Sequence, residues 1–189
     1  MPRHPDPKLE GKILDAAQKL LRKGSEKAVT MRAVASAAGT NTPAVYRRFR
    51  NRKDVVLGLM RRLQNESADI VRSSHTPEEA CQRYLEFALV RRHEYELFYR
   101  YAYQLPRPTK TGAALRDHRP TTKVMEEKLA EHLGGKPGDY SRLSLSLWAL
   151  THGTAMILIS GSIPAEYEGD LRSVFQETVR TLINRPRAA

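Results

Sequence analysis

Five basic residues surround two aromatic residues in the stretch NTPAVYRRFRNRKD, residues 41–54. The basic residues are Arg47, Arg48, Arg50, Arg52 and Lys53, and the aromatic residues are Tyr46 and Phe49. Like charges crowded this closely repel one another unless a polyanion neutralises them. A phosphate backbone would neutralise them, whereas the alternative is a solvated helix face with both aromatics in the core. We favour the core for Phe49 and a phosphate contact for Tyr46, whose hydroxyl can bond a phosphate oxygen.

Two short helices must position these side chains. Thr30 is a good N-cap for the first helix, and Gly39 is a good end for it. A small residue at Ala35 lets two helices approach, Gly39 permits a tight turn between them, and Val45 fills the corner. This pattern predicts a helix-turn-helix, in which the second helix enters the major groove of DNA.

The second helix of this motif is expected over residues 42–49, with Asn41 or Thr42 as its cap and Pro43 in its first turn. The positive end of a helix favours phosphate, so these three residues are candidates for DNA contact. A long helix is expected from about residue 52 to residue 72. Arg52 and Lys53 lie at its start, which places them near a second positive helix end.

The stretch AVTMRAVASAAGTNTPAVYRRFRNRKDVVLGLM resembles the N-terminal DNA-binding domain of the TetR family of transcriptional regulators. The resemblance covers about residues 9–60. The positions that carry it are Thr30, Ala35, Gly39, Val45, Tyr46, Phe49 and Arg52. Thr40 departs from the usual aliphatic residue, Arg52 replaces the common Lys, and Lys53 replaces a usual acid. The changes at 52 and 53 keep or raise the affinity for phosphate.

The resemblance implies specific roles by position. The residues that it implies for base or sugar contact are Arg32, Thr42, Pro43, Ala44 and Arg48, and those that it implies for phosphate contact are Thr30, Tyr46, Arg47 and Arg52. An arginine can grip a guanine edge through two hydrogen bonds, a contact worth about 1–3 kcal/mol of discrimination. Arg48 is therefore the expected reader of one base pair.

The charge of the chain is unevenly distributed. Its net charge is +11, and residues 1–72 hold 16 Lys and Arg against 7 Asp and Glu, while residues 73–189 hold 16 against 14. A basic N-terminal third on a nearly neutral body is typical of a nucleic-acid-binding module joined to another domain. The other interpretation is a general need for solubility, which would not segregate the charge in this way.

The composition also indicates a cellular compartment. The single cysteine, Cys81, allows no disulfide within the chain and suits a reducing cytoplasm. The first residues contain no apolar segment typical of a signal peptide. The most apolar stretch, LSLWALTHGTAMILIS, is interrupted by serine, threonine and histidine and is expected to be too short and too polar for a membrane span.

Apolar residues recur at helical spacing along the chain, and no alternating strand pattern is convincing. The predicted fold is all-α, with a flexible arm at 1–8, a three-helix helix-turn-helix domain at 9–54 and a helical effector-binding and dimerisation domain at 55–189. In the last domain, helices are expected from residue 76 or 77 to 94, over 95–104, within 115–133, and over 141–160 and 167–184.

An aromatic cluster suggests a ligand cavity in the C-terminal domain. Seven of the twelve Tyr and Phe residues fall within residues 84–103. So many hydroxyls exceed the need of a plain core, because each buried Tyr hydroxyl requires a partner. The candidate pocket residues are Tyr84, Phe87, Phe98, Tyr99, Tyr103, Trp148 and His152. Nearby cations, namely Arg91, Arg92, His93 and Arg100, could recognise an acidic ligand, although a solvated face is the alternative for most of them.

Trp148, His152 and Gly153 also resemble a subgroup of the TetR C-terminal domains that is marked by Trp–His–Gly. Trp148 and His152 are four residues apart and so share one helix face. They could line the pocket, as an aromatic wall and a polar handle. For Trp148 we favour a plain core role, whereas for His152 a buried, hydrogen-bonded core role and a ligand contact remain equally open.

The last two predicted helices carry more apolar surface than one monomer core requires. We therefore expect a two-fold homodimer built on a four-helix interface. Candidate interface residues are Leu150, Ile157, Val174, Phe175, Thr178 and Leu182. Such a dimer would bind a palindromic or nearly palindromic operator on double-stranded DNA, because its two recognition helices are related by the same symmetry.

The sequence therefore predicts a cytoplasmic DNA-binding transcriptional regulator. The family resemblance implies a repressor that a small-molecule effector releases from its operator. The alternative is a DNA-binding regulator without a ligand, which a protein partner controls or which occupies its operator constitutively. No zinc-protease, phosphate-loop, nucleophile-elbow or dinucleotide motif is present, so we expect no catalytic residue, no metal and no cofactor.

Overall fold

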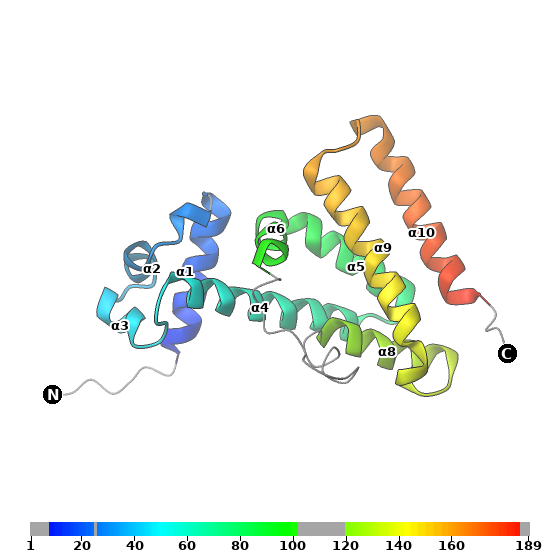
Figure 1. Cartoon of the computed structure of the whole chain (residues 1–189), viewed down its shortest axis with the longest axis horizontal. Coiled ribbons are helices and arrows are strands. Elements are labelled where there is room, and N and C mark those ends of the chain that lie inside the picture. The colour runs from blue at the N-terminus through cyan, green and yellow to red at the C-terminus, as the bar shows by residue number, and fades with distance from the viewer. Residues whose placement is uncertain (1–7, 25, 102–119, 186–189) are drawn as a thin grey trace. The chain divides into compact units, whose positions relative to one another are not determined.

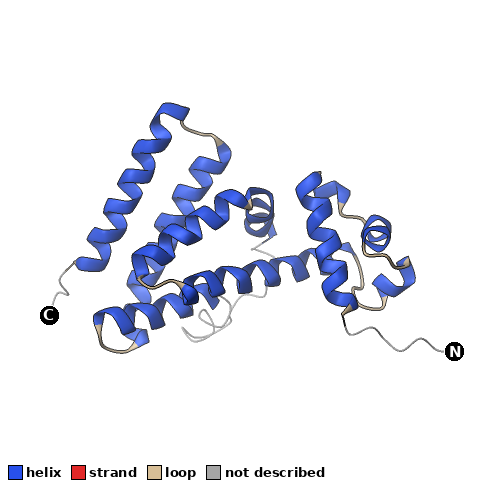
Figure 2. Cartoon of the chain, turned by 180° about the vertical axis from the view of Figure 1, so that it is seen from behind, coloured by secondary structure: helices blue, strands red, loops and turns tan. Residues whose placement is uncertain are grey.

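The computed structural model describes residues 8–24, 26–101 and 120–185. Within these ranges the chain forms nine α-helices joined by short turns and 3-10 segments, and it forms no strand (Figures 1 and 2). The all-α prediction is therefore confirmed. The described residues divide into two compact units, each with its own core.

The first unit comprises the described parts of Met1–Leu63 and His93–Leu105. Its elements are α1 (Leu9–Lys23), the 3-10 turn η1 (Glu26–Ala28), α2 (Met31–Ala37), α3 (Thr42–Tyr46), the first half of α4 (Arg52–Ser73) and nearly all of α6 (Arg92–Tyr101). Its core contains Ile13, Ala17, Val34, Ala35, Val45, Phe49, Val55, Val56 and Leu97. The predicted core role of Phe49 is confirmed, because this side chain is only 4% exposed.

Local capping explains where the helices of the helix-turn-helix begin and end. The Thr30 side chain accepts a hydrogen bond from Ala33 N at 3.1 Å, and the Asn41 side chain accepts one from Ala44 N at 2.9 Å. Between the two helices Gly39 adopts φ 65°, and Gly39 N and Thr40 N donate to carbonyls of the last turn of α2. This is a Schellman ending, which needs a left-handed residue and therefore favours glycine.

The second unit comprises the described parts of Gln64–Arg92 and Pro106–Ala189. Its elements are the rest of α4, α5 (Pro77–Val90), α8 (Pro120–Leu133), η3 (Pro137–Tyr140), α9 (Ser141–Ser160), η4 (Ala165–Tyr167) and α10 (Glu168–Asn184). Helix α9 packs against α5, α8 and α10, and buried side chains such as Leu85, Leu129, Leu147 and Phe175 form the core. Helix α9 ends at Ser160, and the next residue, Gly161, caps it in a left-handed conformation (φ 60°) that turns the chain toward α10.

Three predicted boundaries differ from the structure. Helix α3 ends at Tyr46 and not at residue 49, so Phe49 reaches the core from the following turn. The helix expected through residue 94 ends at Val90, and α6 begins again at Arg92. No proline or glycine marks this break, which explains why helical periodicity could not reveal it. The stretch 102–119 lies outside the described residues.

Helix α9 is apolar on most of its circumference. By length and composition alone, the helical stretch Pro137–Ser160 passes as a membrane span, which differs from the sequence expectation. The core helix of a soluble protein passes the same test. Only 28% of its most apolar window is buried within the protein, and most of the other apolar side chains of α9 are half-buried. Part of this apolar surface therefore stays accessible in a single copy.

Candidate nucleic-acid interface

Most predicted DNA-contact side chains lie on the surface of the first unit. Tyr46 is 52% exposed, although it is a large aromatic residue next to the buried Val45. Arg32, Pro43, Arg47, Arg48 and Lys53 are also exposed, and Thr42 is half-buried. An exposed tyrosine hydroxyl beside exposed guanidinium groups can bond to phosphate oxygens along a duplex.

Ala44 is the exception among the predicted contacts. It is 4% exposed and packs inside the unit, so its side chain offers little surface to a base. Its backbone N–H is also occupied, since it donates to the Asn41 side chain. Helix α3 has only five residues, and one of the N–H groups at its start is thereby used within the protein. The exposed side chains, more than the dipole of so short a helix, therefore provide the positive character of this surface.

Arg52 has several partners within the protein. Its Nε donates to Val29 O at 2.8 Å, and its Nη2 donates to Glu26 O at 2.6 Å and to the Glu26 carboxylate at 2.9 Å. These bonds tie the first turn of α4 to the segment that precedes α2. A phosphate contact by Arg52 stays a prediction, and the structure adds a structural role for this side chain.

The Glu26 carboxylate also binds two residues of α6. The Tyr101 hydroxyl donates to Glu26 Oε1, and Arg100 Nη1 lies 3.2 Å from Glu26 Oε2. Burial alone would raise the pKa of Glu26, but the hydrogen bonds from Tyr101 and Arg52 and the charges of Arg52 and Arg100 outweigh it and lower that pKa. The pKa of Tyr101 is raised, first by its hydrogen bond to Glu26 and then by burial.

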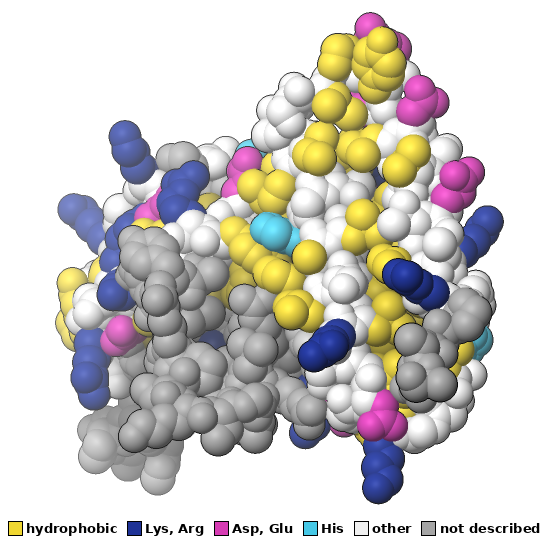
Figure 3. Space-filling view, turned by 45° about the vertical axis from the view of Figure 1, so that its right-hand side comes forward, with side chains coloured by type: hydrophobic (Ala, Val, Ile, Leu, Met, Phe, Trp, Pro, Cys, Tyr) yellow, Lys and Arg dark blue, Asp and Glu magenta, His cyan; other side chains and the backbone are white. Residues whose placement is uncertain are grey.

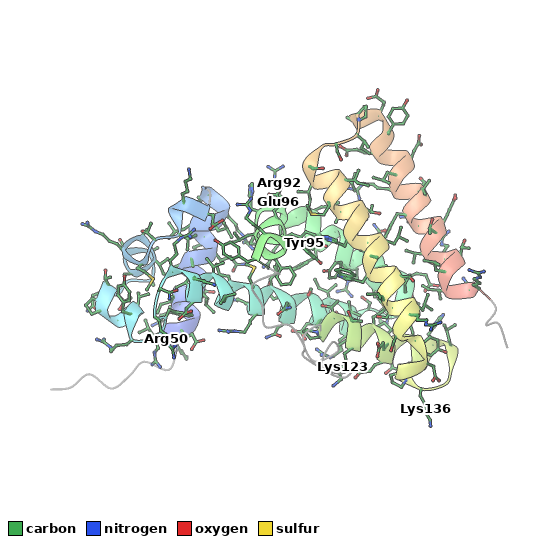
Figure 4. All side chains as sticks on the ribbon, in the orientation of Figure 1. Arg50, Arg92, Tyr95, Glu96, Lys123 and Lys136 are labelled. Carbon is green, nitrogen blue, oxygen red and sulfur yellow. The ribbon has the colours of Figure 1, made fainter. Side chains whose placement is uncertain are left out.

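A second pairing holds α6 on α1. The Glu94 side chain is only 5% exposed, and it accepts a hydrogen bond from Arg22 Nε at 2.6 Å and from Gln18 Nε2 at 3.4 Å. The neighbouring Tyr95 is buried, and Figure 4 shows it on α6 within the first unit. Sequence reasoning missed Glu26 and Glu94, because their partners are 26 to 76 residues away and a single sequence does not show which acid meets which base.

The second unit contains a cavity of about 310 Å³, including the part that is open to solvent. Its lining residues come from α4, α5, α8 and α9: Val71, Cys81, Tyr84, Thr121, Thr122, Met125, Ser144, Leu147, Trp148 and Thr151. Tyr84 and Trp148 were predicted pocket residues and lie on this cavity. His152 stacks on Trp148 with a 5.5 Å separation of ring centroids, but it is not among the lining residues.

The remaining predicted pocket residues lie elsewhere. Phe98 belongs to α6 and packs against the core of the first unit, and the ring of Tyr99 contacts that of Tyr95 on the same helix at a tilt of 55°. Phe87 is on α5 but does not line the cavity, and Tyr103 lies outside the described residues. Helical spacing predicted that these aromatic residues share helix faces. It could not show that the aromatic residues of α6 pack in the first unit and not beside the cavity.

The predicted dimer residues lie on α9 and α10, and they differ in exposure. Leu150, Ile157, Thr178 and Leu182 are half-buried, and Val174 is 57% exposed. Phe175 is a core residue of its own chain, being only 2% exposed, so it is not available to a partner. Figure 3 shows apolar side chains exposed on the face formed by the C-terminal helices, with few charges between them.

No group of three or more His, Cys, Asp or Glu side chains that could hold a metal ion occurs among the described residues. The Cys81 thiol is buried, and burial raises its pKa to about 12 despite a hydrogen bond with Thr151 that lowers it. The thiol is therefore protonated at neutral pH, which makes it a poor nucleophile and a poor metal ligand.

Two protein-family models match the chain. Residues 13–59 match the model of bacterial regulatory proteins of the tetR family, and residues 78–182 match the model of the tetracyclin repressor-like C-terminal domain. The second match alone spans more than half of the 189 residues. No curated protein matches the chain.

Solved structures share the fold at low sequence identity. A TetR-family transcriptional regulator from Streptomyces coelicolor is 19% identical, with coverage of 94% of this chain and 98% of that one and a TM-score of 0.63. A TetR variant from Acinetobacter baumannii AYE, in complex with minocycline, is 17% identical, with coverage of 92% and 93% and a TM-score of 0.62. The multidrug binding protein EbrR, complexed with imidazole, is 22% identical, with coverage of 100% and 96% and a TM-score of 0.61.

Proposed function

Because this chain belongs to the tetR family of bacterial regulatory proteins, and is thus a transcriptional regulator and not an enzyme, we propose that it is a repressor that a small molecule releases from a palindromic operator. The observation that carries the proposal is the exposed cluster of Tyr46, Arg47 and Arg48 on a helix-turn-helix whose other face is buried. Exposed arginines beside a phenolic hydroxyl match the chemistry of a phosphate backbone.

The protein acts as a homodimer in this proposal. The exposed Val174 and the uncovered apolar surface of α9 support a second copy as the cover for this face. A two-fold axis there would repeat the recognition helix, so the two half-sites would lie one helical turn of DNA apart or a multiple of it. The operator would therefore be a palindrome or nearly one, and the protein would work in the cytoplasm.

Control by an effector is the last part of the proposal. The cavity in the second unit is the candidate effector site, and the complexes of two neighbours with minocycline and imidazole support a ligand in this fold. The stacked pair of Trp148 and His152 supports membership of the Trp–His–Gly subgroup. An effector releases the operator only if it binds the non-DNA-binding conformation more tightly than the DNA-binding one.

The direct test is to select bound duplexes from random DNA at one salt concentration and then to vary the salt. The selected sequence should be palindromic, and its affinity should fall linearly with the logarithm of salt concentration. Arg47→Ala should reduce that slope by about 1. The matched control is Arg180→Ala on the exposed face of α10, which should leave the slope unchanged. A protein that prefers no duplex even at low salt would contradict the proposal.

A further inference from the structure

We propose that the cavity of the second unit binds a compact, uncharged molecule that has an apolar body and one hydrogen-bond donor. This inference rests on the proposed function, in which that cavity is the effector site, and it names the chemical class of the effector. The observation that carries the inference is the set of ten lining residues in the described part of the chain. It contains two aromatics, three aliphatic or thioether side chains, four hydroxyl groups beyond the tyrosine and one thiol.

The described lining carries no charge. None of its ten residues is Asp, Glu, Lys, Arg or His. The thiol of Cys81 adds no charge at neutral pH, since burial holds its pKa at about 12. A carboxylate or ammonium group that enters such a site loses its hydration without gaining an ionic partner, and this loss disfavours binding. An uncharged ligand avoids that cost.

Two of the four cations that the sequence suggested for an acidic ligand, Arg91 and Arg100, form ion pairs, and none of the four lines the cavity. Arg91 pairs with Glu66 at 2.5 Å, and Arg100 pairs with Glu26 in the first unit. On α8 the buried Lys128 donates to Ser74 O at 2.5 Å, and neither it nor the buried Glu126 is a lining residue. The recognition of an acid by these arginines therefore finds no support at this cavity.

The lining hydroxyls favour a ligand that donates a hydrogen bond. The Ser144 hydroxyl donates to Thr122 O at 3.1 Å, and the Thr151 hydroxyl donates to Leu147 O at 2.7 Å. Their protons are thus used within the protein, whereas each oxygen keeps lone pairs that can accept. An alcohol or a phenol meets these acceptors, and a pure hydrocarbon does not.

The size of the cavity limits the ligand. Its empty space of about 310 Å³ includes the part that is open to solvent, so the enclosed part is smaller than this. The aromatic side chains of Tyr84 and Trp148 offer flat apolar walls. A single-ring molecule with one hydroxyl therefore fits the observed chemistry and size better than a large polycyclic compound.

The chain contains a built-in reporter of occupancy. Trp148 is the only tryptophan in the sequence, and it lines the cavity. Its fluorescence should change when a ligand contacts the indole. The full-length protein is titrated with benzyl alcohol, toluene, benzoate and benzylammonium, which share one ring and differ in the group that it carries. Benzyl alcohol should bind at least tenfold more tightly than either ion and measurably more tightly than toluene.

Two variants assign the binding to this site. Thr151→Val keeps the shape of the side chain and removes its oxygen, so it should abolish the preference for benzyl alcohol over toluene. Thr178→Val on α10 makes the same change at a half-buried position that does not line the cavity, and it should leave the preference intact. Thermal unfolding of each variant shows that it is folded before the titration is interpreted.

The outcomes separate this inference from the proposed function. If benzyl alcohol changes the fluorescence and lowers operator affinity, both are supported. A fluorescence change with unaltered operator affinity supports the ligand class and contradicts effector control. Tighter binding of benzoate or benzylammonium overturns the ligand class, whether or not the operator is released. The absence of any saturable change with all four probes also overturns it.

Discussion

The Glu26 carboxylate lies 2.9 Å from Nη2 of Arg52, and this pair joins the segment before α2 to the first turn of α4. The same carboxylate is held by Tyr101 and Arg100, which come from α6. One acidic side chain thus connects three parts of the first unit that are distant in sequence. Helix α6 directly follows α5 of the second unit along the chain. The contacts of Glu26 with Tyr101 and Arg100 therefore hold α6 in the first unit.

We predict that Glu26→Gln destabilises the protein at neutral pH by about 1–2 kcal/mol, as expected for the loss of charge-assisted hydrogen bonds. The pKa of Glu26 is lowered in the folded state, so the contribution of its charge is present above the ordinary value of 4.5 and is lost as the pH falls through the folded-state pKa. Thermal unfolding of the native protein and the variant should therefore differ at pH 7 and converge in acid.

Glu10→Gln on the exposed face of α1 serves as the matched control, and it should leave the unfolding temperature at pH 7 unchanged. If Glu26→Gln and the native protein differed by the same amount at every pH, the stabilising role of the Glu26 charge would be contradicted.

The exposed tyrosine and its neighbouring arginine should affect DNA binding in different ways. Tyr46→Phe removes the hydroxyl that we propose binds a phosphate oxygen, and it should weaken binding to every sequence about fivefold, the equivalent of roughly 1 kcal/mol. Arg48→Ala should remove about 1–3 kcal/mol of discrimination at one base pair. Binding to a panel of operators with single base changes distinguishes the two patterns. A uniform loss for Arg48→Ala would identify it as a phosphate contact.

The turn between α2 and α3 depends on the backbone conformation of Gly39. A Cβ atom at this position would meet nothing within 4 Å, so steric contact is not the obstacle. The cost comes from φ 65°, which L-residues adopt at about 1–2 kcal/mol. Gly39→Ala should lower stability by about this amount, and Gly39→Asn should lower it less, because asparagine tolerates the left-handed region. Denaturant unfolding measures both, and equal losses would contradict the explanation.

The exposed apolar face of α10 can be tested by adding a charge. Val174→Glu should weaken self-association more than tenfold, because a buried carboxylate without a partner is costly. Val90→Glu, at an 83% exposed site on α5, is the same chemical change on a different helix and should leave association unchanged. Sedimentation velocity over a range of concentrations measures both variants. Unaltered association of Val174→Glu would exclude this residue from the interface.

The sequence was most informative where structure depends on local chemistry. Thr30 as a cap, Gly39 in the turn and the range of α9 were predicted from residue type and spacing, and the structure has them in these places. Contacts between distant segments were not predictable in this way. Phe98 and Tyr84 share an aromatic-rich stretch, yet Phe98 packs in the first unit and Tyr84 lines the cavity of the second. A break in the helix without proline or glycine separates them.

The same limit applies to the candidate sites. Trp148 became a pocket candidate through the resemblance to the Trp–His–Gly subgroup, although a core role was favoured for it, and it lies on the cavity. Helical periodicity could not select Ser144 or Thr151, because hydroxyl residues on an apolar helix carry no periodic signal. Helical periodicity also predicted Phe175 at a dimer interface, although Phe175 is buried in the core of its own chain. An apolar stripe shows that a face is covered, and only the packed structure shows which neighbour covers it.

The incomplete burial of α9 has a consequence for gene control. In the proposed homodimer, a second copy covers the apolar surface that α9 leaves accessible in a single copy, so the stability of each copy would rise with the protein concentration. At low concentration the protein would then be less stable, and fewer molecules would be dimers that can bind two half-sites at once. Occupancy of the operator would then rise more steeply than linearly with the intracellular concentration of the protein. Regulation of the target gene would therefore have a concentration threshold.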